Sequence, residues 1–381
     1  MNVSLFRKLL PFFAACLIAG ANILQGQTAP PPNAMGGPRP PEIAEAKAIA
    51  QPKNDEELAA AIRKLATELA ASGKFSGSIL VAANEKILVD NAWGEADRKA
   101  KSPNKPETAF DTGSIGKLFT QIAILQLVEA GKLKLDDTID KCLSDYPNHE
   151  VASKVTVRQL LLHSSGIPDF LEKMTPEMNL GSIRELKDFL PLFAQKPLEF
   201  APGSANRYSN SGYIVLGLIV EKLSAENYYS YVKEKILDPA GMTHSGFFDR
   251  EHLPSTVARS YEGDRDVTDL HPPRGSSAGG LQASAGDLFR LVQTINAAKL
   301  INKESIKVLR GLIPVPPNAP PPADESKLIA YGISGGAPGV SSQVGIDPAG
   351  HYTRVILCNG SPPMAMAMGA TIRGWMQSLP K

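Results

Sequence analysis

The stretch Asp111-Thr-Gly-Ser-Ile-Gly-Lys-Leu-Phe-Thr120 carries a hydroxyl and an amine three residues apart, at Ser114 and Lys117. Apolar residues then continue at helical spacing (Leu118, Ile122, Leu125 and Val128), which predicts a buried helix that starts here. At a helix start the two side chains lie on one face, with their Cβ atoms about 5–6 Å apart. The amine can accept the hydroxyl proton, and the free N–H groups of the first turn can stabilise an oxyanion. The stretch therefore predicts a serine nucleophile that needs no histidine.

The spacing Ser-x-x-Lys alone is not specific, because a serine at a helix start is usually only a cap. The same spacing also occurs at Ser102/Lys105, Ser230/Lys233 and Ser378/Lys381. The first pair lies among prolines and lysines, the second within a predicted helix and the third at the chain end. The prediction for Ser114 therefore depends on partners elsewhere in the chain.

Two later segments offer such partners. Tyr208 and Asn210 lie on a short link between a Pro-Gly turn and an apolar helix. A tyrosine there can relay protons if a nearby lysine lowers its pKa from about 10. An asparagine there can hydrogen-bond a substrate amide. The alternative is that the tyrosine belongs to a turn and the asparagine caps the helix. The other segment is Tyr331-Gly-Ile-Ser-Gly-Gly-Ala-Pro-Gly339, in which glycines follow a predicted strand. Glycines there allow a substrate backbone to approach closely and leave a backbone N–H free to bind an oxyanion. The alternative is that the glycines form a bulge or a tight bend.

Both ends of the folded chain have strand composition, whereas the middle is helical. Strands are predicted at 76–83, 86–93, 328–334, 341–346 and 352–358. Helices are predicted at 55–73, 119–130, 157–162, 183–193, 213–223, 228–237, 285–297 and 364–377. This order predicts an α+β protein in which both chain ends build one antiparallel sheet with flanking helices, beside an all-helical lobe. A cleft between such lobes is a favoured ligand site.

Charge and histidine content narrow the choice of partner. Lys and Arg total 40 against 39 Asp and Glu, so the formal charge of +1 gives no field that would attract nucleic acid or an anionic membrane. The six histidines form no His-Glu-x-x-His or comparable cluster. The sequence therefore predicts a protein that acts on a small molecule, with no metal and no organic cofactor.

The N-terminal residues are typical of an exported protein. Arg7-Lys8 precede an apolar stretch from Leu9 to about Leu24, and Ala19-Gly20-Ala21 is a possible cleavage site. Residues 1–27 are therefore predicted to be a signal peptide, because the stretch is shorter than the roughly 20 apolar residues of a membrane anchor. A periplasmic or secreted protein, with no stable membrane span after cleavage, would follow.

Residues 28–54 are rich in proline and glycine and are predicted to be a linker, which leaves 55–381 as the folded domain. Export would permit a disulfide between Cys142 and Cys358, while two buried free thiols are an equally good interpretation.

These motifs, in this order, resemble the serine hydrolase family that contains class C β-lactamases, related penicillin-binding proteins, D-amino-acid peptidases and esterases. The resemblance runs from about Phe75 to the C-terminus. The matching stretches are Thr112-Gly-Ser-Ile-Gly-Lys117, Gln159-Leu-Leu-Leu-His-Ser-Ser-Gly-Ile-Pro168, Tyr208-Ser-Asn210, Asp238-Pro-Ala-Gly-Met242, Gly279-Gly-Leu-Gln-Ala-Ser284 and the glycine-rich stretch from Gly332. The resemblance implies a β-lactamase/transpeptidase-like fold.

It also implies roles for individual residues. Ser114 would form an acyl-enzyme with an ester, amide, β-lactam or D-amino-acid peptide, while Lys117 and Tyr208 would share the proton transfers. Which of the two is the general base stays open. Asn210, Ser334 and Gly335 would bind substrate, and the N–H groups of Ser114 and Gly336 would form the oxyanion hole. His163 is interpreted as structural. The alternative is a non-catalytic member of the same fold that binds peptidoglycan or peptides.

One motif departs from the family pattern. The family usually has Lys or His, then Thr or Ser, then Gly, whereas this chain has Ile333-Ser334-Gly335. Losing a charge-assisted hydrogen bond costs roughly 1.5–3 kcal/mol, so binding of a substrate carboxylate should be weak. Three arginines could replace the missing cation, but each is expected at the surface: Arg207, Arg274 and Arg354. The departure favours an esterase or amidase with uncharged acyl substrates over an efficient β-lactamase.

Gly275-Ser-Ser-Ala-Gly279 fits the Gly-x-Ser-x-Gly motif of α/β-hydrolases, and Asp347 and His351 follow in the matching order. That motif must follow an apolar strand, but the preceding residues are Asp269-Leu-His-Pro-Pro-Arg274. This alternative is therefore rejected.

Overall fold

The computed structural model describes residues 41–171, 180–315, 321, 323, 324, 326–328 and 330–379. The predicted signal peptide and residues 28–40 of the predicted linker lie outside the described residues. Within the described part, no helix is both long and apolar enough to cross a membrane.

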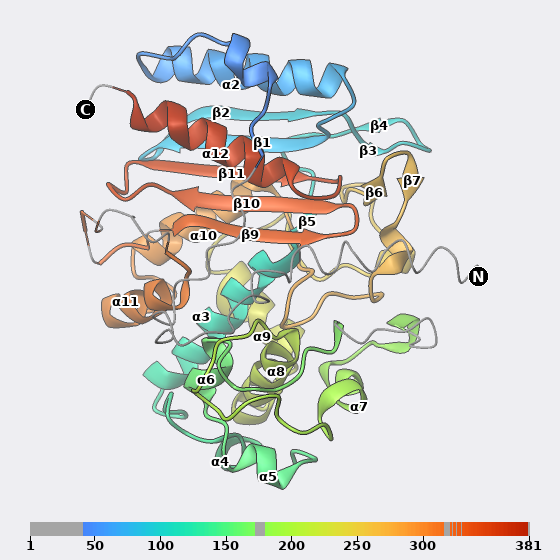
Figure 1. Ribbon diagram of the computed structural model, residues 1–381, viewed down its shortest axis with the longest axis vertical. Helices are drawn as coiled ribbons and strands as arrows, with labels where there is room; N and C mark the ends of the chain where they lie inside the picture. The colour runs from blue at the N-terminus through green and yellow to red at the C-terminus, as the bar shows by residue number, and fades with distance from the viewer. Residues whose placement is uncertain are drawn as a thin grey trace, which may run out of the picture.

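A five-stranded antiparallel sheet forms the centre of the upper half of Figure 1, in the order β2-β1-β11-β10-β9. Its strands are β1 (Gly77–Ala83), β2 (Lys86–Trp93), β9 (Ala330–Ala337), β10 (Val340–Ile346) and β11 (Tyr352–Cys358). The two chain ends meet where β1 pairs with β11, with Gly77 opposite Cys358. The predicted α+β class, with one antiparallel sheet built from both chain ends, is confirmed.

Both faces of this sheet are covered by helices, and for this reason every residue of β1, β10 and β11 is buried. α2 (Asp55–Ala71) and α12 (Met364–Gln377) cover one face, and α10 (Ala285–Asn296) covers the other (Figure 1). Side chains alternate between the faces. Ile79 and Val81 accordingly pack with α2 and α12, whereas Leu80 packs in the larger core with α10.

The helical lobe lies beneath the sheet in Figure 1 and is built around α8 (Asn210–Ser224). Every residue from Asn210 to Val220 is buried, as expected for a helix surrounded by others. The neighbouring helices are α3 (Lys117–Glu129), α4 (Ile139–Cys142), α5 (His149–Ala152), α6 (Val157–Leu161), α7 (Leu190–Phe193), α9 (Tyr228–Val232) and α11 (Lys303–Leu312). Of these, α3, α4, α6 and α9 contact α8 directly.

Short strand pairs connect the two halves. β5 (Phe110–Asp111) pairs with β8 (Gln282–Ala283), which brings residues far apart in sequence together just before Ser114. Two small hairpins lie beside the sheet, β3 (Glu95–Asp97) with β4 (Ser102–Pro103) and β6 (Tyr261–Glu262) with β7 (Arg265–Asp266).

The folded part begins earlier than the predicted boundary at 55. Ile43 is buried in the core between α2 and α12, and a short 3-10 helix spans Glu45–Ala48. The cap of α2 is Asn54, whose side chain accepts a hydrogen bond from the Glu57 N–H. Part of the segment predicted as a linker therefore packs on the domain.

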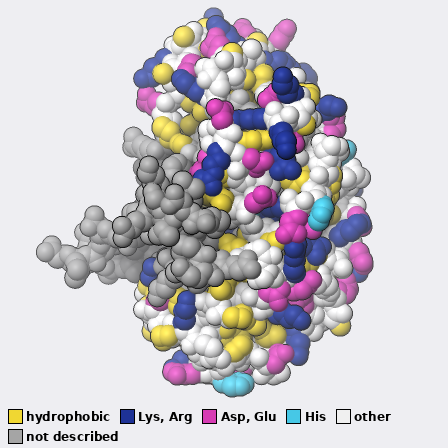
Figure 2. Space-filling view, turned by 90° about the vertical axis from the view of Figure 1, so that its right-hand side faces the viewer, with side chains coloured by type: hydrophobic (Ala, Val, Ile, Leu, Met, Phe, Trp, Pro, Cys, Tyr) yellow, Lys and Arg dark blue, Asp and Glu magenta, His cyan; other side chains and the backbone are white. Residues whose placement is uncertain are grey.

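The two cysteines and one of the arginines have surroundings that the sequence left open or predicted differently. Cys142 and Cys358 are both free, buried thiols, because one lies in the core of the helical lobe and the other in the core under α12. Arg354 was predicted at the surface, but it is buried on β11 with 1% of its surface exposed. Its guanidinium occupies the space over Gly345 of β10, which has no side chain. On the face in Figure 2, basic and acidic side chains are interspersed, in agreement with the near-neutral charge.

Candidate active site

Ser114 lies in a 3-10 turn, Gly113–Gly116, that leads directly into α3. The preceding Asp111 fixes this turn, because its Oδ1 accepts a hydrogen bond of 2.8 Å from the Gly113 N–H. Gly113 has a φ of +52°, and a Cβ there would lie 2.8 Å from the backbone nitrogen of Gly336. Glycine is therefore required both for the backbone conformation and for the close approach of β9.

The Ser114 hydroxyl lies between the two predicted proton carriers. Its Oγ is 2.7 Å from the Tyr208 hydroxyl and 3.4 Å from the Lys117 Nζ. The structure thus brings together three residues that the sequence places up to 94 positions apart. The arrangement allows the serine proton to leave toward either neighbour.

Lys117 is buried, although lysine rarely is. Its Nζ donates to the Asn210 Oδ1 at 2.7 Å and to the Ala278 carbonyl oxygen. Burial lowers the pKa of Lys117 to about 7, while the nearby Asp169 opposes that shift. An amine with such a pKa can be neutral near neutral pH, as a general base must be.

Tyr208 rests on His163, with the two rings stacked at 4.4 Å between centroids. The His163 Nδ1 accepts a hydrogen bond from the Ser209 N–H, and its carbonyl oxygen accepts one from the Arg207 N–H at 2.8 Å. Burial and then the charge of Lys117 lower the pKa of His163 to about 3, so its ring is neutral at neutral pH. These contacts agree with the structural interpretation of His163.

Asn210 is the first residue of α8, and its amide has a fixed orientation. Its Oδ1 faces Lys117, and its Nδ2 donates to the Asp169 Oδ2 at 2.9 Å. Asp169, which directly follows the motif that ends at Pro168, was not among the residues predicted for the site. Its position after that motif was the only signal, and an aspartate after proline is also a common turn residue.

The edge strand β9 passes directly against the Ser114 turn. A Cβ on Gly335 would lie 2.9 Å from the Ser114 nitrogen and would overlap the carbonyl oxygen of Thr112. The strand extends beyond the predicted end at Ser334, through Gly335 and Gly336. The N–H groups predicted for the oxyanion hole, those of Ser114 and Gly336, therefore belong to two backbone segments in contact.

The strand register separates Ile333 from Ser334. Ile333 is opposite Val344 and packs against the larger core, on the face of β9 where Gly335 touches the Ser114 turn. Ser334 is opposite Gln343, whose Nε2 donates to its hydroxyl at 3.3 Å. Because neighbouring side chains point to opposite faces, the Ser334 side chain lies on the other face of β9 from Ile333 and Gly335, and its role in substrate binding stays a prediction.

The three arginines considered as replacements for the family cation are held elsewhere. Arg207 is about half exposed and pairs with Glu199 at 2.9 Å. The Arg274 guanidinium lies 3.7 Å from the ring centroid of Tyr229, and Arg354 is buried on β11.

The rejected Gly-x-Ser-x-Gly motif forms a loop rather than a strand-to-helix turn. The Ser277 side chain is fully buried against Gly217 of α8. Asp347 lies in the β10–β11 connection, where its Oδ1 accepts from the N–H groups of His351 and Tyr352. The loop contributes its backbone to the Ser114 site instead, through the Ala278 carbonyl oxygen.

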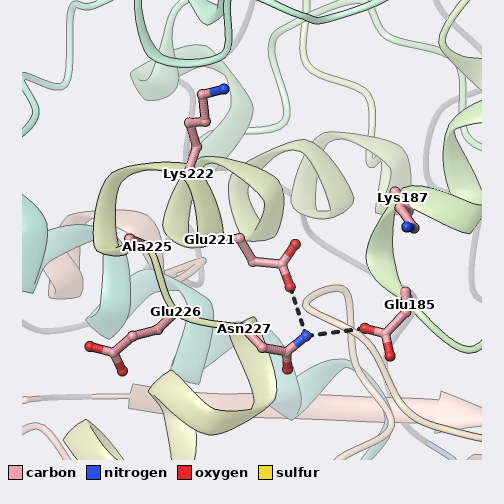
Figure 3. Close-up of a pocket in the computed structure, with 7 residues that line it drawn as sticks. All are labelled: Glu185, Lys187, Glu221, Lys222, Ala225, Glu226 and Asn227. Carbon is pink, nitrogen blue, oxygen red and sulfur yellow. Dashed lines mark hydrogen bonds between the residues drawn. The ribbon is translucent and has the colours of Figure 1, made fainter.

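Other polar groups lie away from this site. A hollow of about 520 Å³ occupies the far end of α8, where Asn227 bridges Glu221 and Glu185 at 3.3 and 3.1 Å (Figure 3). About 16 Å of helix separates Glu221 from Asn210, so this hollow is separate from the Ser114 site. Among the described residues, one group has metal-ligand spacing, and it is exposed: Asp249, Glu251 and His252.

The cluster of Ser114, Lys117 and Tyr208 lies where the sheet meets the helical lobe. This fold and this site together define the class of Ser-x-x-Lys serine hydrolases. Residues 62–374 match the family model named Beta-lactamase, and the chain belongs to this family. The predicted resemblance is thereby confirmed.

Similar proteins include penicillin-binding proteins and an amidase. PbpX of Bacillus subtilis (strain 168), named as a penicillin-binding protein, is 32% identical over 271 residues, which cover 68% of this chain and 65% of PbpX. The chain thus matches slightly less than two thirds of that relative. The penicillin binding protein from Bacillus halodurans has a TM-score of 0.68 and 30% identity, covering 82% of this chain and 99% of that one. The D-amino acid amidase from Ochrobactrum anthropi SV3 has a TM-score of 0.68 at 21% identity, covering 84% and 98%, and shows the fold alone.

Proposed function

We propose that this protein is an exported serine hydrolase that cleaves esters or amides through an acyl-enzyme on Ser114. One observation carries the proposal: the Ser114 hydroxyl lies 2.7 Å from Tyr208 and 3.4 Å from the buried Lys117. A serine that served only as a helix cap would have no need of a buried lysine.

The reaction proceeds in two acyl transfers. The Ser114 Oγ attacks the substrate carbonyl carbon while its proton passes to Lys117 or Tyr208. The N–H groups of Ser114 and Gly336 hydrogen-bond the oxyanion that forms. The C–O or C–N bond then breaks, Tyr208 protonates the leaving alcohol or amine, and the acyl group stays on Ser114.

Deacylation reverses these roles. A water molecule attacks the acyl carbon, and its proton passes to the Lys117–Tyr208 pair. Ser114 leaves with a proton from that pair, so the free enzyme is regenerated together with a carboxylic acid. Asn210 keeps Lys117 directed at Ser114 and hydrogen-bonds the amide of a peptide-like substrate.

The proposed substrates have uncharged acyl groups. Ile333 supplies no charge on the face of β9 that touches the Ser114 turn, and Arg207, Arg274 and Arg354 are engaged elsewhere. This combination supports an esterase or amidase rather than an efficient β-lactamase. The family resemblance keeps D-amino-acid peptides among the candidate substrates, and the names of the penicillin-binding relatives keep β-lactams there. Export is proposed from the predicted signal peptide at residues 1–27.

Pre-steady-state hydrolysis of a short p-nitrophenyl ester tests this proposal. The wild type should release a burst of p-nitrophenol that equals the enzyme concentration and then turn over steadily, whereas Ser114→Ala should do neither. Ser204→Ala, an exposed serine on the loop before Tyr208, is the matched control and should keep full activity. Unchanged hydrolysis by Ser114→Ala would refute the assignment. A non-catalytic receptor of the same fold would leave Ser114 unlabelled by a fluorophosphonate probe.

A further inference from the structure

A buried carboxylate lies one amide group away from Lys117. Asp169 follows α6 in the helical lobe, and only 3% of its surface is exposed. Its Oδ1 accepts from the Leu171 N–H at 3.0 Å, and its Oδ2 accepts from the Asn210 Nδ2 at 2.9 Å. Burial raises the pKa of Asp169, while these two N–H donors and the charge of Lys117 favour its ionised form.

The contacts continue from Asn210 to the nucleophile. Because Asp169 accepts from the Asn210 Nδ2, the amide oxygen must face the other way, where it accepts from Lys117 at 2.7 Å. Lys117 in turn lies 3.4 Å from the Ser114 Oγ. The chain Asp169–Asn210–Lys117–Ser114 therefore has a single consistent direction of hydrogen bonding.

We propose that Asp169 is a positioning residue that holds the Asn210 amide in one orientation and supplies the counter-charge for Lys117 during the Ser114 reaction. The inference rests on the proposed function and adds to it a charge that acts on Lys117 through Asn210. Without that counter-charge, the ammonium form of a buried lysine would have no opposite charge to stabilise it.

Among the described residues, the other groups that contact Lys117 provide no such charge. Tyr208 and Tyr213 present their ring faces, with centroids 4.7 and 5.3 Å from the Nζ. Burial keeps His163 neutral, and from the loop before α10 the Ala278 carbonyl contributes only a dipole. Asp169 is the charged group whose field opposes the effect of burial on the pKa of Lys117.

These contacts determine the direction in which the titration of Lys117 should shift when Asp169 is replaced. The negative charge of Asp169 favours protonated Lys117, so its removal should let Lys117 lose its proton at lower pH. Unit charges separated by one amide group in a protein interior shift each other's titration by about one to two pH units. In Asp169→Asn the single carbonyl oxygen can satisfy only one of the two N–H donors, which weakens the hold on Asn210 as well.

The experiment follows the titration of Lys117 in two ways. The pH dependence of kcat/KM on a neutral p-nitrophenyl ester is compared between wild type and Asp169→Asn. In parallel, the Lys117 resonance is titrated by NMR in protein with ¹³C-labelled lysine ε-carbons, and it is assigned by its absence in Lys117→Ala. Both measurements should move to lower pH by at least one unit in Asp169→Asn.

Asp287→Asn is the matched control. Asp287 is also buried, and its Oδ2 accepts from the His244 N–H and the Ser245 hydroxyl, but it lies at the start of α10 outside the Ser114 site. Its substitution should lower stability without moving either titration. If Asp169→Asn lowers only stability or kcat and leaves both titrations in place, Asp169 is merely structural and the inference is overturned. Failure of the proposed function would appear separately, as hydrolysis that survives Ser114→Ala, while the NMR titration would still test Asp169.

Discussion

Replacing Ile333 by lysine should create affinity for a substrate carboxylate. Ile333 lies on β9 opposite Val344, half-buried, on the face where Gly335 touches the Ser114 turn. Two residues along a strand span about 6.6 Å, which a lysine side chain can reach across. The new ammonium group would therefore lie near the carbonyl under attack.

The size of the effect follows from the bond that would form. A hydrogen bond to a charged group contributes roughly 1.5–3 kcal/mol, which corresponds to about 10- to 150-fold in kcat/KM. Ile333 packs against the core, so its loss should reduce stability by about 1 kcal/mol, and activity on neutral esters should fall by a few fold. The predicted quantity is therefore the ratio of kcat/KM for a charged ester to kcat/KM for a neutral ester, in which such general losses cancel.

The assay uses two p-nitrophenyl esters of equal length, one with and one without a carboxylate on the acyl group. In Ile333→Lys the ratio of kcat/KM, carboxylate ester over neutral ester, should rise at least tenfold, and nitrocefin hydrolysis should rise with it. Ile333→Met keeps an apolar side chain of similar reach and serves as the control. A ratio that stays within threefold of wild type, or that rises equally in Ile333→Met, would refute the assignment of Ile333 as the missing cation position.

Three further sets of substitutions test the surrounding structure. Lys117→Ala and Tyr208→Phe should lower kcat by similar factors, and the double variant should lose little more, because the effects of groups that act as one unit are not additive. In the wild type, kcat/KM should rise with pH through about 7, because Lys117, whose pKa is lowered, loses its proton there and becomes a base. Arg250→Ala leaves Asp111, whose side chain is only 9% exposed, without its ionic partner and should lower the free energy of unfolding in urea by about 3–5 kcal/mol, whereas pairing Arg250→Met with Asp111→Asn should cost less than the single change. Gly335→Ala places a methyl group 2.9 Å from the Ser114 nitrogen and should abolish the burst while retaining a cooperative thermal transition, and wild-type activity would contradict the predicted oxyanion hole.

The fold was predictable because its strands carry continuous apolar runs at both chain ends. Such runs are expected when both faces of a sheet are covered, as they are for β1, β10 and β11. The helical middle was predictable from its spacing, and the central helix α8 is apolar on all sides. Ser114, Lys117, Tyr208 and Asn210 were predictable because each lies in a short motif whose residue types suit acyl transfer.

The remaining contacts depend on pairings that local sequence does not encode. The Ala278 carbonyl that accepts from Lys117 is a backbone group, for which residue identity gives no signal. The face that Ser334 presents is set by the register of β9, and a shift of one residue reverses it. Arg354 is buried because β11 pairs with β10, which places Gly345 opposite it and leaves room for the guanidinium.

The isoleucine at 333 bears on catalysis as well as on binding. In the family pattern a cation at this position would repel the charge on the reactive lysine and help to lower its pKa. Here that repulsion is absent at position 333, and burial is the largest cause of the lowered pKa of Lys117, with Asp169 acting against it. Ile333 is an apolar residue that packs against the larger core, so position 333 supplies neither a partner for a carboxylate nor a charge that acts on Lys117. Ile333→Lys should therefore change two properties together, gaining carboxylate affinity and moving the acid limb of kcat/KM to lower pH. A gain in carboxylate affinity with an unmoved limb would mean that the new ammonium group lies too far from Lys117 to interact with it.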